Sequence, residues 1–181
     1  MLQIISATNR PNSHTNLVAR SIQKLLPENI SSNVLSLQDL NNSDLITESM
    51  FSKNRPSDII SEWQQKHLIP SSHWIIIAPE YNGSFPGILK LFLDVLSVKQ
   101  AKETFHGKKV GLVGVSTGRA GNLRGLDQLT GVLHYLNMEV MPFKLPISSI
   151  DQFIMEDQSL SEGVRLPLED FIHKFLIFSE K

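Results

Sequence analysis

The chain has 181 residues, of which 41% are hydrophobic and 19% charged, a balance typical of one globular domain spanning residues 1–181. Lys and Arg number 17 against 18 Asp and Glu, so the net charge of −1 provides no basic field to hold a nucleic acid. The absence of cysteine excludes disulfides, thiol catalysis and Cys-ligated metals. With no signal-like start and no apolar run of membrane-spanning length, we expect a cytoplasmic protein without a membrane partner.

The first third of the chain predicts a strand, a loop and a helix. Leu2–Ile5 is a short apolar run, typical of a buried strand, and it leads into a polar loop at 6–16. Apolar residues then recur at helical spacing from Leu17 or Val18 until Pro27. A weaker strand is predicted at 33–37.

The middle of the chain contains the clearest strand signal. Residues 38–56 show little periodicity, and their role is not evident from the sequence. Pro56 and Ser57 are typical of a helix start, and the helical pattern ends at Pro70. The run 74–78 is β-branched and unalternated, as expected for a strand covered on both faces.

The remaining elements continue the alternation of helices and strands. A helix at 87–97 is apolar around nearly its whole circumference, which predicts burial on two sides. A strong strand follows at 110–115, then a helix with leucines spaced from 126 to 136. A short strand at 140–141 and an amphipathic helix around 168–176 complete the chain.

This order predicts an α/β fold of three layers, with a five-stranded parallel sheet and helices on both faces. Ligands of such sheets bind beyond the carboxyl ends of the strands. The polar loops 6–16, 79–86 and 116–122 each follow a predicted strand, so we expect them to meet at one site.

The first loop has the residues of a phosphate site. It precedes a helix N-terminus, where free N–H groups favour an anion, and Arg10 would add a charge-assisted hydrogen bond. The hydroxyls of Ser13 and Thr15 could donate to phosphate oxygens. Alternatively, one of them only caps the helix, and no glycine-rich fingerprint accompanies the loop.

The second loop, PEYNGSFPG at 79–87, directly follows the strongest strand. Tyr81 and Phe85 are aromatic in a loop stiffened by prolines, which suggests a preformed wall for a flat ligand. Asn82–Gly83 is also a common turn pair, so the loop could be only a well-formed turn.

The third loop contains the pattern G-x-S-x-G around Ser116, which also occurs at the nucleophile of serine hydrolases. Residues that could complete such a site on paper are Asp127, Asp151, His134 and His173. This alternative leaves the second loop unexplained, and both histidines are expected to be packed or surface residues. No His, Asp or Glu cluster has metal-ligand spacing.

Taken together, the three loops resemble the NADPH-dependent FMN reductase family, a flavodoxin-like group that includes chromate, quinone and azo-dye reductases. The family pattern R-x-x-S occurs at Arg10–Ser13, P-E-Y-N at Pro79–Asn82, and S-x-P-G-x-L-K at Ser84–Lys90. Ser116 corresponds to the third-loop serine. Where family members usually have Gly-Ser, this chain has Ala7 and Thr8, which leaves the detailed geometry of the phosphate loop open.

The resemblance implies a flavodoxin-like fold, bound FMN, and NADPH or NADH as the hydride donor. The flavin performs the chemistry, so no catalytic side chain is assigned. The predicted cofactor-binding residues are Thr8, Arg10, Asn12, Ser13, His14, Thr15, Pro79, Glu80, Tyr81, Asn82, Gly83, Ser116, Thr117 and Gly118.

The implied activity is a ping-pong transfer of electrons from the nicotinamide to a small-molecule acceptor such as a flavin, quinone or azo compound. The family further implies a homodimer or homotetramer, and the apolar helix 87–97 is consistent with an interface. An electron carrier similar to flavodoxin is the alternative, although such carriers are usually strongly acidic and this chain is nearly neutral.

Overall fold

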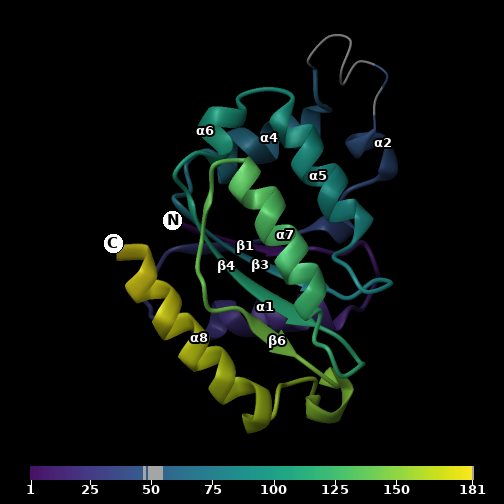
Figure 1. Ribbon diagram of the computed structural model, residues 1–181, viewed down its shortest axis with the longest axis vertical. Coiled ribbons are helices and arrows are strands. Elements are labelled where there is room, and N and C mark those ends of the chain that lie inside the picture. Colours follow the sequence, from purple (N-terminus) through teal and green to yellow (C-terminus); the bar gives the residue numbers. More distant parts are fainter. Residues whose placement is uncertain (47, 49–54, 181) are drawn as a thin grey trace.

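The strands form one parallel sheet in the order β2-β1-β3-β4-β5, and β6 also pairs with β4 (Figure 1). The computed structural model describes residues 1–46, 48 and 55–180. The strands lie at Leu2–Ser6 (β1), Ser32–Ser36 (β2), His73–Pro79 (β3), Lys109–Val115 (β4), Glu139–Val140 (β5) and Leu145–Ile147 (β6). This strand order is that of flavodoxin-like sheets, with the switch point between β1 and β3.

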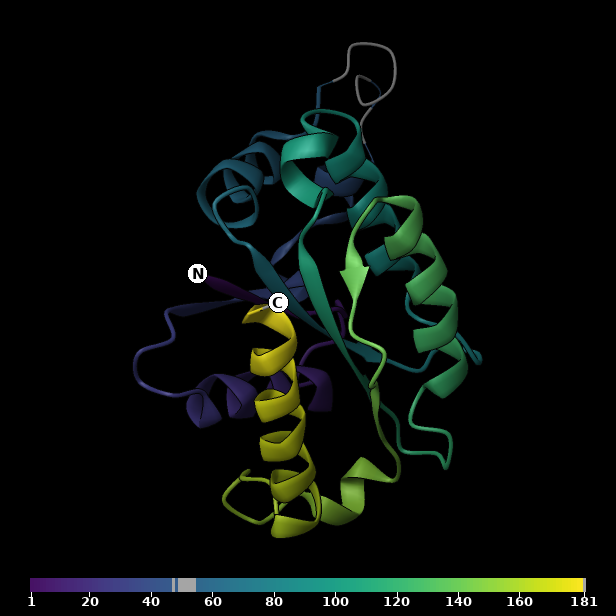
Figure 2. The ribbon, with the colours of Figure 1, turned by 60° about the vertical axis from the view of Figure 1, so that its left-hand side comes forward.

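Helices cover both faces of the sheet. The α-helices lie at His14–Leu25 (α1), Asn42–Leu45 (α2), Asp58–Trp63 (α4), Gly87–Ser97 (α5), Ala101–Phe105 (α6), Leu123–Tyr135 (α7) and Glu162–Glu180 (α8). Single turns lie at Leu37–Asp39 (η1), Gln64–Leu68 (η2) and Ile150–Phe153 (η3). In Figure 2, α8 and α7 lie on opposite sides of the strands. The predicted three-layer α/β architecture is therefore confirmed.

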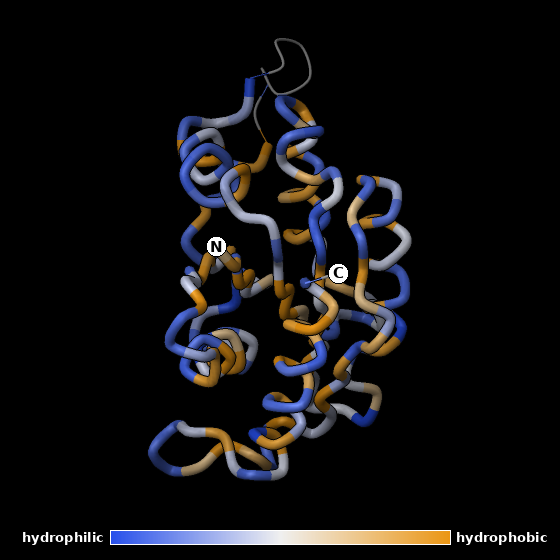
Figure 3. The backbone as a smooth tube through the Cα atoms, turned by 90° about the vertical axis from the view of Figure 1, so that its left-hand side faces the viewer, coloured by the Kyte–Doolittle hydropathy of each residue, from blue (hydrophilic) through white to orange (hydrophobic). Residues whose placement is uncertain are grey.

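The two central strands contribute side chains to both hydrophobic cores. Along β3, Trp74 and Ile76 point into the core shared with α4, α5, α6 and α7, whereas Ile75 and Ile77 point into the core shared with α1 and α8. All four side chains are fully buried. Figure 3 shows hydrophobic and hydrophilic residues alternating along the helices, as expected where each helix covers the sheet with one face.

The fifth position of the sheet is shared by two short strands. The strand predicted at 140–141 is observed as β5, but β6 was not predicted. β5 pairs with the start of β4, and β6 pairs with its end, at Val113–Val115. Pro142 lies between them and has no N–H to donate, so a continuous ladder is interrupted there.

Two helices begin earlier than their apolar patterns predicted. α1 starts at His14 instead of Leu17 or Val18, because Ser13 caps it and the polar first turn carries no hydrophobic signal. α8 starts at Glu162, six residues before the predicted apolar stretch, and contains Pro167. In the described part of the chain, no helix is long and apolar enough to cross a membrane.

The bounds predicted for α5 are those observed, and its apolar surface is largely covered within the chain itself. Its buried residues are Leu89, Phe92, Leu93, Val95 and Leu96. Ile88 and Leu91 remain partly exposed. The prediction of burial on two sides is therefore mostly satisfied without a partner.

Candidate functional site

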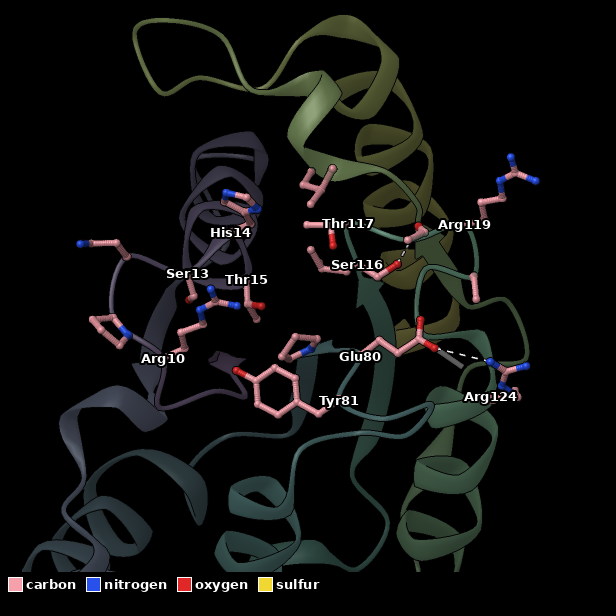
Figure 4. A pocket seen from close by; sticks show the side chains of 17 residues that line it. Arg10, Ser13, His14, Thr15, Glu80, Tyr81, Ser116, Thr117, Arg119 and Arg124 are labelled. Atoms are coloured by element: carbon pink, nitrogen blue, oxygen red, sulfur yellow. Dashed lines mark hydrogen bonds and ion pairs between the residues drawn. The ribbon is translucent and has the colours of Figure 1, made fainter.

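The three loops that follow β1, β3 and β4 meet at the carboxyl edge of the sheet, around a cavity of about 740 Å³ (Figure 4). This confirms the predicted convergence. Side chains of the first loop lie on one side, those of the third loop on the other, and Glu80 and Tyr81 lie between them. The volume falls within the range of small-ligand and cofactor pockets.

Most predicted site residues line this cavity. They are Arg10, Asn12, Ser13, His14, Thr15, Pro79, Glu80, Tyr81, Ser116, Thr117 and Gly118. Thr8, Asn82 and Gly83 were also predicted but do not line it. The lining residues that were not assigned are Pro11, Val115, Arg119, Ala120, Arg124 and Ile150. Arg119 lies inside the third loop, so its charge was an available signal, whereas Arg124 and Ile150 lie beyond the loops.

The first loop presents unpaired donors to the cavity. Ser13 caps α1, since its Oγ accepts from the N–H of Asn16 at 3.2 Å. First-turn N–H groups have no partner inside a helix, and those of His14 and Thr15 have no acceptor among the described residues. Arg10 lines the same end of the cavity. Ser13 is thus the predicted cap and also lines the cavity, where its hydroxyl hydrogen stays available for the predicted bond to phosphate.

Thr8 supports the second loop. Its Oγ1 lies 2.7 Å from the phenolic oxygen of Tyr81 and accepts from the N–H of Arg10 at 3.1 Å. Ala7 and Thr8 are both buried. The residues that replace the usual Gly-Ser pair are therefore accommodated, and the threonine hydroxyl joins the first loop to Tyr81.

Asn82 and Gly83 form a tight turn and do not line the cavity. Tyr81 and Ser84 exchange backbone hydrogen bonds at 2.9 and 3.1 Å, and Asn82 and Gly83 have φ values of 51° and 77°. Positive φ at both central positions is typical of a tight hairpin turn. Asn82 and Gly83 thus form the predicted turn, and their assignment to the cofactor site stays a prediction. Phe85, expected to face a flat ligand, packs instead against the core.

The third loop is held by its own serine. The Ser116 Oγ donates to the carbonyl of Gly118 at 2.9 Å and accepts from the N–H of Gly121 at 3.0 Å. The four residues that could have completed a hydrolase site on paper do not line the cavity: Asp127, His134, Asp151 and His173. His134 and His173 are exposed on α7 and α8. The hydroxyl is thus a loop brace, and this geometry does not support a nucleophile.

The cavity is lined by more positive than negative charge. Arg10, Arg119 and Arg124 line it, and Glu80 is its acidic residue in the described part of the chain. Arg124 lies 3.7 Å from the Glu80 carboxylate, whose side chain is 17% exposed. The balance favours an anionic ligand, and a helix N-terminus with hydroxyls at one end and a loop wall at the other fits a phosphorylated flat molecule such as FMN.

A smaller cavity of about 310 Å³ shares Tyr81 with the first. Its walls include Leu45, Ile46, Ile88 and Leu91, and among the described residues no charged side chain lines it. Ile46 is 63% exposed. This groove is therefore a mainly apolar surface beside the larger, charged one.

Residues 2–151 match the family model of NADPH-dependent FMN reductase. The chain belongs to this family. It is accordingly an oxidoreductase that uses FMN, with NAD(P)H as the donor. The family assignment favours the enzyme over the electron carrier.

Individual relatives agree with this assignment. A 2-hydroxy-1,4-benzoquinone reductase from Burkholderia sp is 24% identical and is matched over 96% of this chain and 93% of its own length. The flavoenzyme FerB from Paracoccus denitrificans, an NAD(P)H:(acceptor) oxidoreductase, has a TM-score of 0.80 at 20% identity, covering 99% of this chain and 96% of its own. The flavodoxin of Fusobacterium nucleatum, with FMN bound, has a TM-score of 0.56 at 15% identity, covering 98% and 97%. These structures support the predicted flavodoxin-like fold.

Proposed function

We propose that the large cavity is the FMN site of this reductase. Arg10, Ser13 and Thr15 at the N-terminus of α1 would hold the phosphate, and Pro79–Tyr81 with the third loop would hold the isoalloxazine. The observation that carries the proposal is the convergence of an anion-binding helix start and a preformed loop wall on one cavity of about 740 Å³. FMN held there would supply the redox chemistry between the nicotinamide donor and the acceptor.

The reaction we propose is ping-pong, with a quinone as the acceptor. The role of the chain is to bind and orient the flavin. It also leaves one opening of the cavity free, which the donor and then the acceptor occupy. The benzoquinone reductase relative supports this acceptor class, as do the apolar side chains that wall the groove beside Tyr81. A groove with apolar walls suits an apolar ring.

The decisive experiment is a visible spectrum of the purified protein after incubation with FMN and desalting, followed by anaerobic addition of NADPH. We expect retained flavin that bleaches rapidly, and then recovers its absorbance when a benzoquinone is added. Steady-state rates at several fixed quinone concentrations should give parallel double-reciprocal lines. If micromolar protein retains no flavin, the proposed site is wrong; if the lines intersect, the ping-pong order is wrong.

We also propose a homo-oligomer that works in the cytoplasm, where reduced nicotinamide donors are available. Apolar side chains on α7 support self-association, because Leu123 is 48% and Tyr135 86% exposed. Light scattering after size-exclusion chromatography measures the assembly directly. A mass close to 20.4 kDa would contradict it.

A further inference from the structure

Asn122 is a buried residue with an unusual role at the start of α7. Its side chain is fully buried and its φ is 62°, a left-handed conformation that Asn tolerates better than most residues. An Asn at a helix start ordinarily accepts a hydrogen bond from a first-turn N–H. Asn122 makes no such bond, and its Oδ1 is buried without a partner among the described residues. Capping of α7 therefore does not explain this residue.

The amide of Asn122 is directed toward the second loop instead. Its Nδ2 donates to the carbonyls of Ala78 at 3.1 Å and Pro79 at 2.9 Å, the last two residues of β3. Its backbone N–H donates to Oε2 of Glu80 at 3.1 Å. One residue therefore holds both the backbone at the start of the second loop and the carboxylate that lines the cavity.

Gly125 leaves the space that this arrangement needs. A Cβ added there would lie 2.0 Å from Oδ1 of Asn122 and 2.6 Å from the backbone nitrogen of Phe85. The first turn of α7 is thus in close contact with the second loop, with the amide of Asn122 between them. A larger residue at 125 would displace the amide, the loop or both.

We propose that Asn122 is a positioning residue for the isoalloxazine end of the FMN site. It fixes the Pro79–Tyr81 wall and keeps the Glu80 carboxylate turned toward Arg124, on the side of α7 (Figure 4). The Asn122 side chain does not cap α7 and instead holds the loop wall. The wall is therefore rigid before the ligand binds, which lowers the entropic cost of binding. This inference rests on the proposed function, since it concerns the same site.

The test compares the affinities of FMN and riboflavin, which lacks the phosphate. Asn122→Gly keeps the left-handed backbone and removes the amide, and Asn122→Asp keeps the shape but replaces a donor with an acceptor facing two carbonyls. We expect both variants to bind FMN and riboflavin about tenfold more weakly, by the same factor for each, because only the ring end is affected. The visible spectrum of the FMN-saturated variants should also differ from that of the wild type.

Asn137→Gly is the matched control, because Asn137 has φ of 59° after the other end of α7, outside the cavity. It should bind both flavins as the wild type does. Wild-type riboflavin affinity and an unchanged spectrum in both Asn122 variants would overturn the inference. If neither variant folds, Asn122 serves the fold and the inference is likewise overturned. If the wild type itself binds neither flavin, the proposed function has failed.

Discussion

The two edges of the parallel sheet use their polar groups in opposite ways. At the amino edge, just before β4, the Lys108 ammonium is buried and donates to the carbonyls of Leu68, Ile69 and Ser71 at 2.5, 2.9 and 2.6 Å. Its three hydrogens have three acceptors. At the carboxyl edge, by contrast, the N–H groups that begin α1 and the Arg10 side chain face a cavity.

Polar groups at the amino edge of the sheet therefore contribute to stability, whereas those at the carboxyl edge contribute to ligand binding. A second buried group at the amino edge, the Gln64 amide, likewise donates to the carbonyls of Leu96 at 3.0 Å and Lys99 at 2.7 Å. Donors that are satisfied internally stabilise the fold and cannot serve a ligand. Donors left unpaired at the other edge contribute little to the fold and remain available for an anion. Substitutions at the two edges should therefore change different measured quantities.

The largest effect is expected for Lys108→Met. The substitution keeps the length of the side chain but removes the Lys108 donor from three carbonyls, of which, among the described residues, only that of Leu68 keeps a donor, from Ser71. This loss should lower the free energy of unfolding by about 3 kcal/mol. Urea denaturation monitored by circular dichroism measures this change. Lys102→Met, at an exposed position of α6, should have little effect. Weaker FMN binding by the folded Lys108→Met protein would contradict the expectation that substitutions at the amino edge change stability and leave binding unchanged.

Arg10→Ala tests the opposite edge. Loss of a charge-assisted hydrogen bond to phosphate should weaken FMN binding by about 2 kcal/mol, or about 30-fold, with almost no change in unfolding free energy. Riboflavin affinity should stay the same, because riboflavin carries no phosphate. Arg20→Ala, at an exposed position of α1, is the matched control. Equal losses for FMN and riboflavin would mean that Arg10 does not meet the phosphate.

Ser116→Ala should have a smaller effect at the same edge. Its hydroxyl braces the third loop through Gly118 and Gly121, so its loss should weaken FMN binding by about 1 kcal/mol, or about fivefold. NADPH oxidation at saturating FMN should persist. Ser97→Ala, which removes a hydroxyl bound to the Asp94 carbonyl at an exposed position of α5, serves as the control. An esterase activity that disappears in Ser116→Ala would revive the hydrolase alternative.

The carboxyl edge was largely predictable from the sequence, whereas the amino edge was not. Strand ends, polar loops and the Pro79–Asn82 motif are local signals, and the parallel topology brings them together. The contacts that adjust the site depend on tertiary packing. Nothing local to Asn122 indicates that its amide reaches β3, and nothing near Lys108 indicates three carbonyls from a segment about 40 residues earlier.

The start of α1 and the strand β6 were missed for related reasons. A polar first turn looks like loop when apolar periodicity is the signal, although Ser13 was recognised as a candidate cap. β6 has only three residues, one of which is Pro146, so its pairing with β4 is dictated by the neighbouring strand more than by its own composition. Asn82 and Gly83 belong to a local motif but do not line the cavity, so their part in cofactor binding stays a prediction.

The smallest effect is a pH dependence at the amino edge. Burial lowers the pKa of His73, assisted by the charges of the amino terminus and Lys109, while its bond to the Ser179 carbonyl partly opposes the shift. The unfolded chain, with a histidine pKa of about 6.5, therefore binds more protons than the folded chain just below that pH. The free energy of unfolding should fall as the pH drops from 7.5 to 5.5, by less than about 1 kcal/mol because the ring is partly solvated.

His73→Gln isolates this contribution, since glutamine retains a polar side chain but does not titrate. The difference in unfolding free energy between wild type and variant should shrink as the pH decreases. The FMN affinities of the two proteins should instead change with pH in the same way. Curves of unfolding free energy that run parallel over the whole range would show that His73 carries none of the dependence. A change in FMN affinity with the same profile would mean that the two edges are coupled, and the separation of stability from binding would then have to be abandoned.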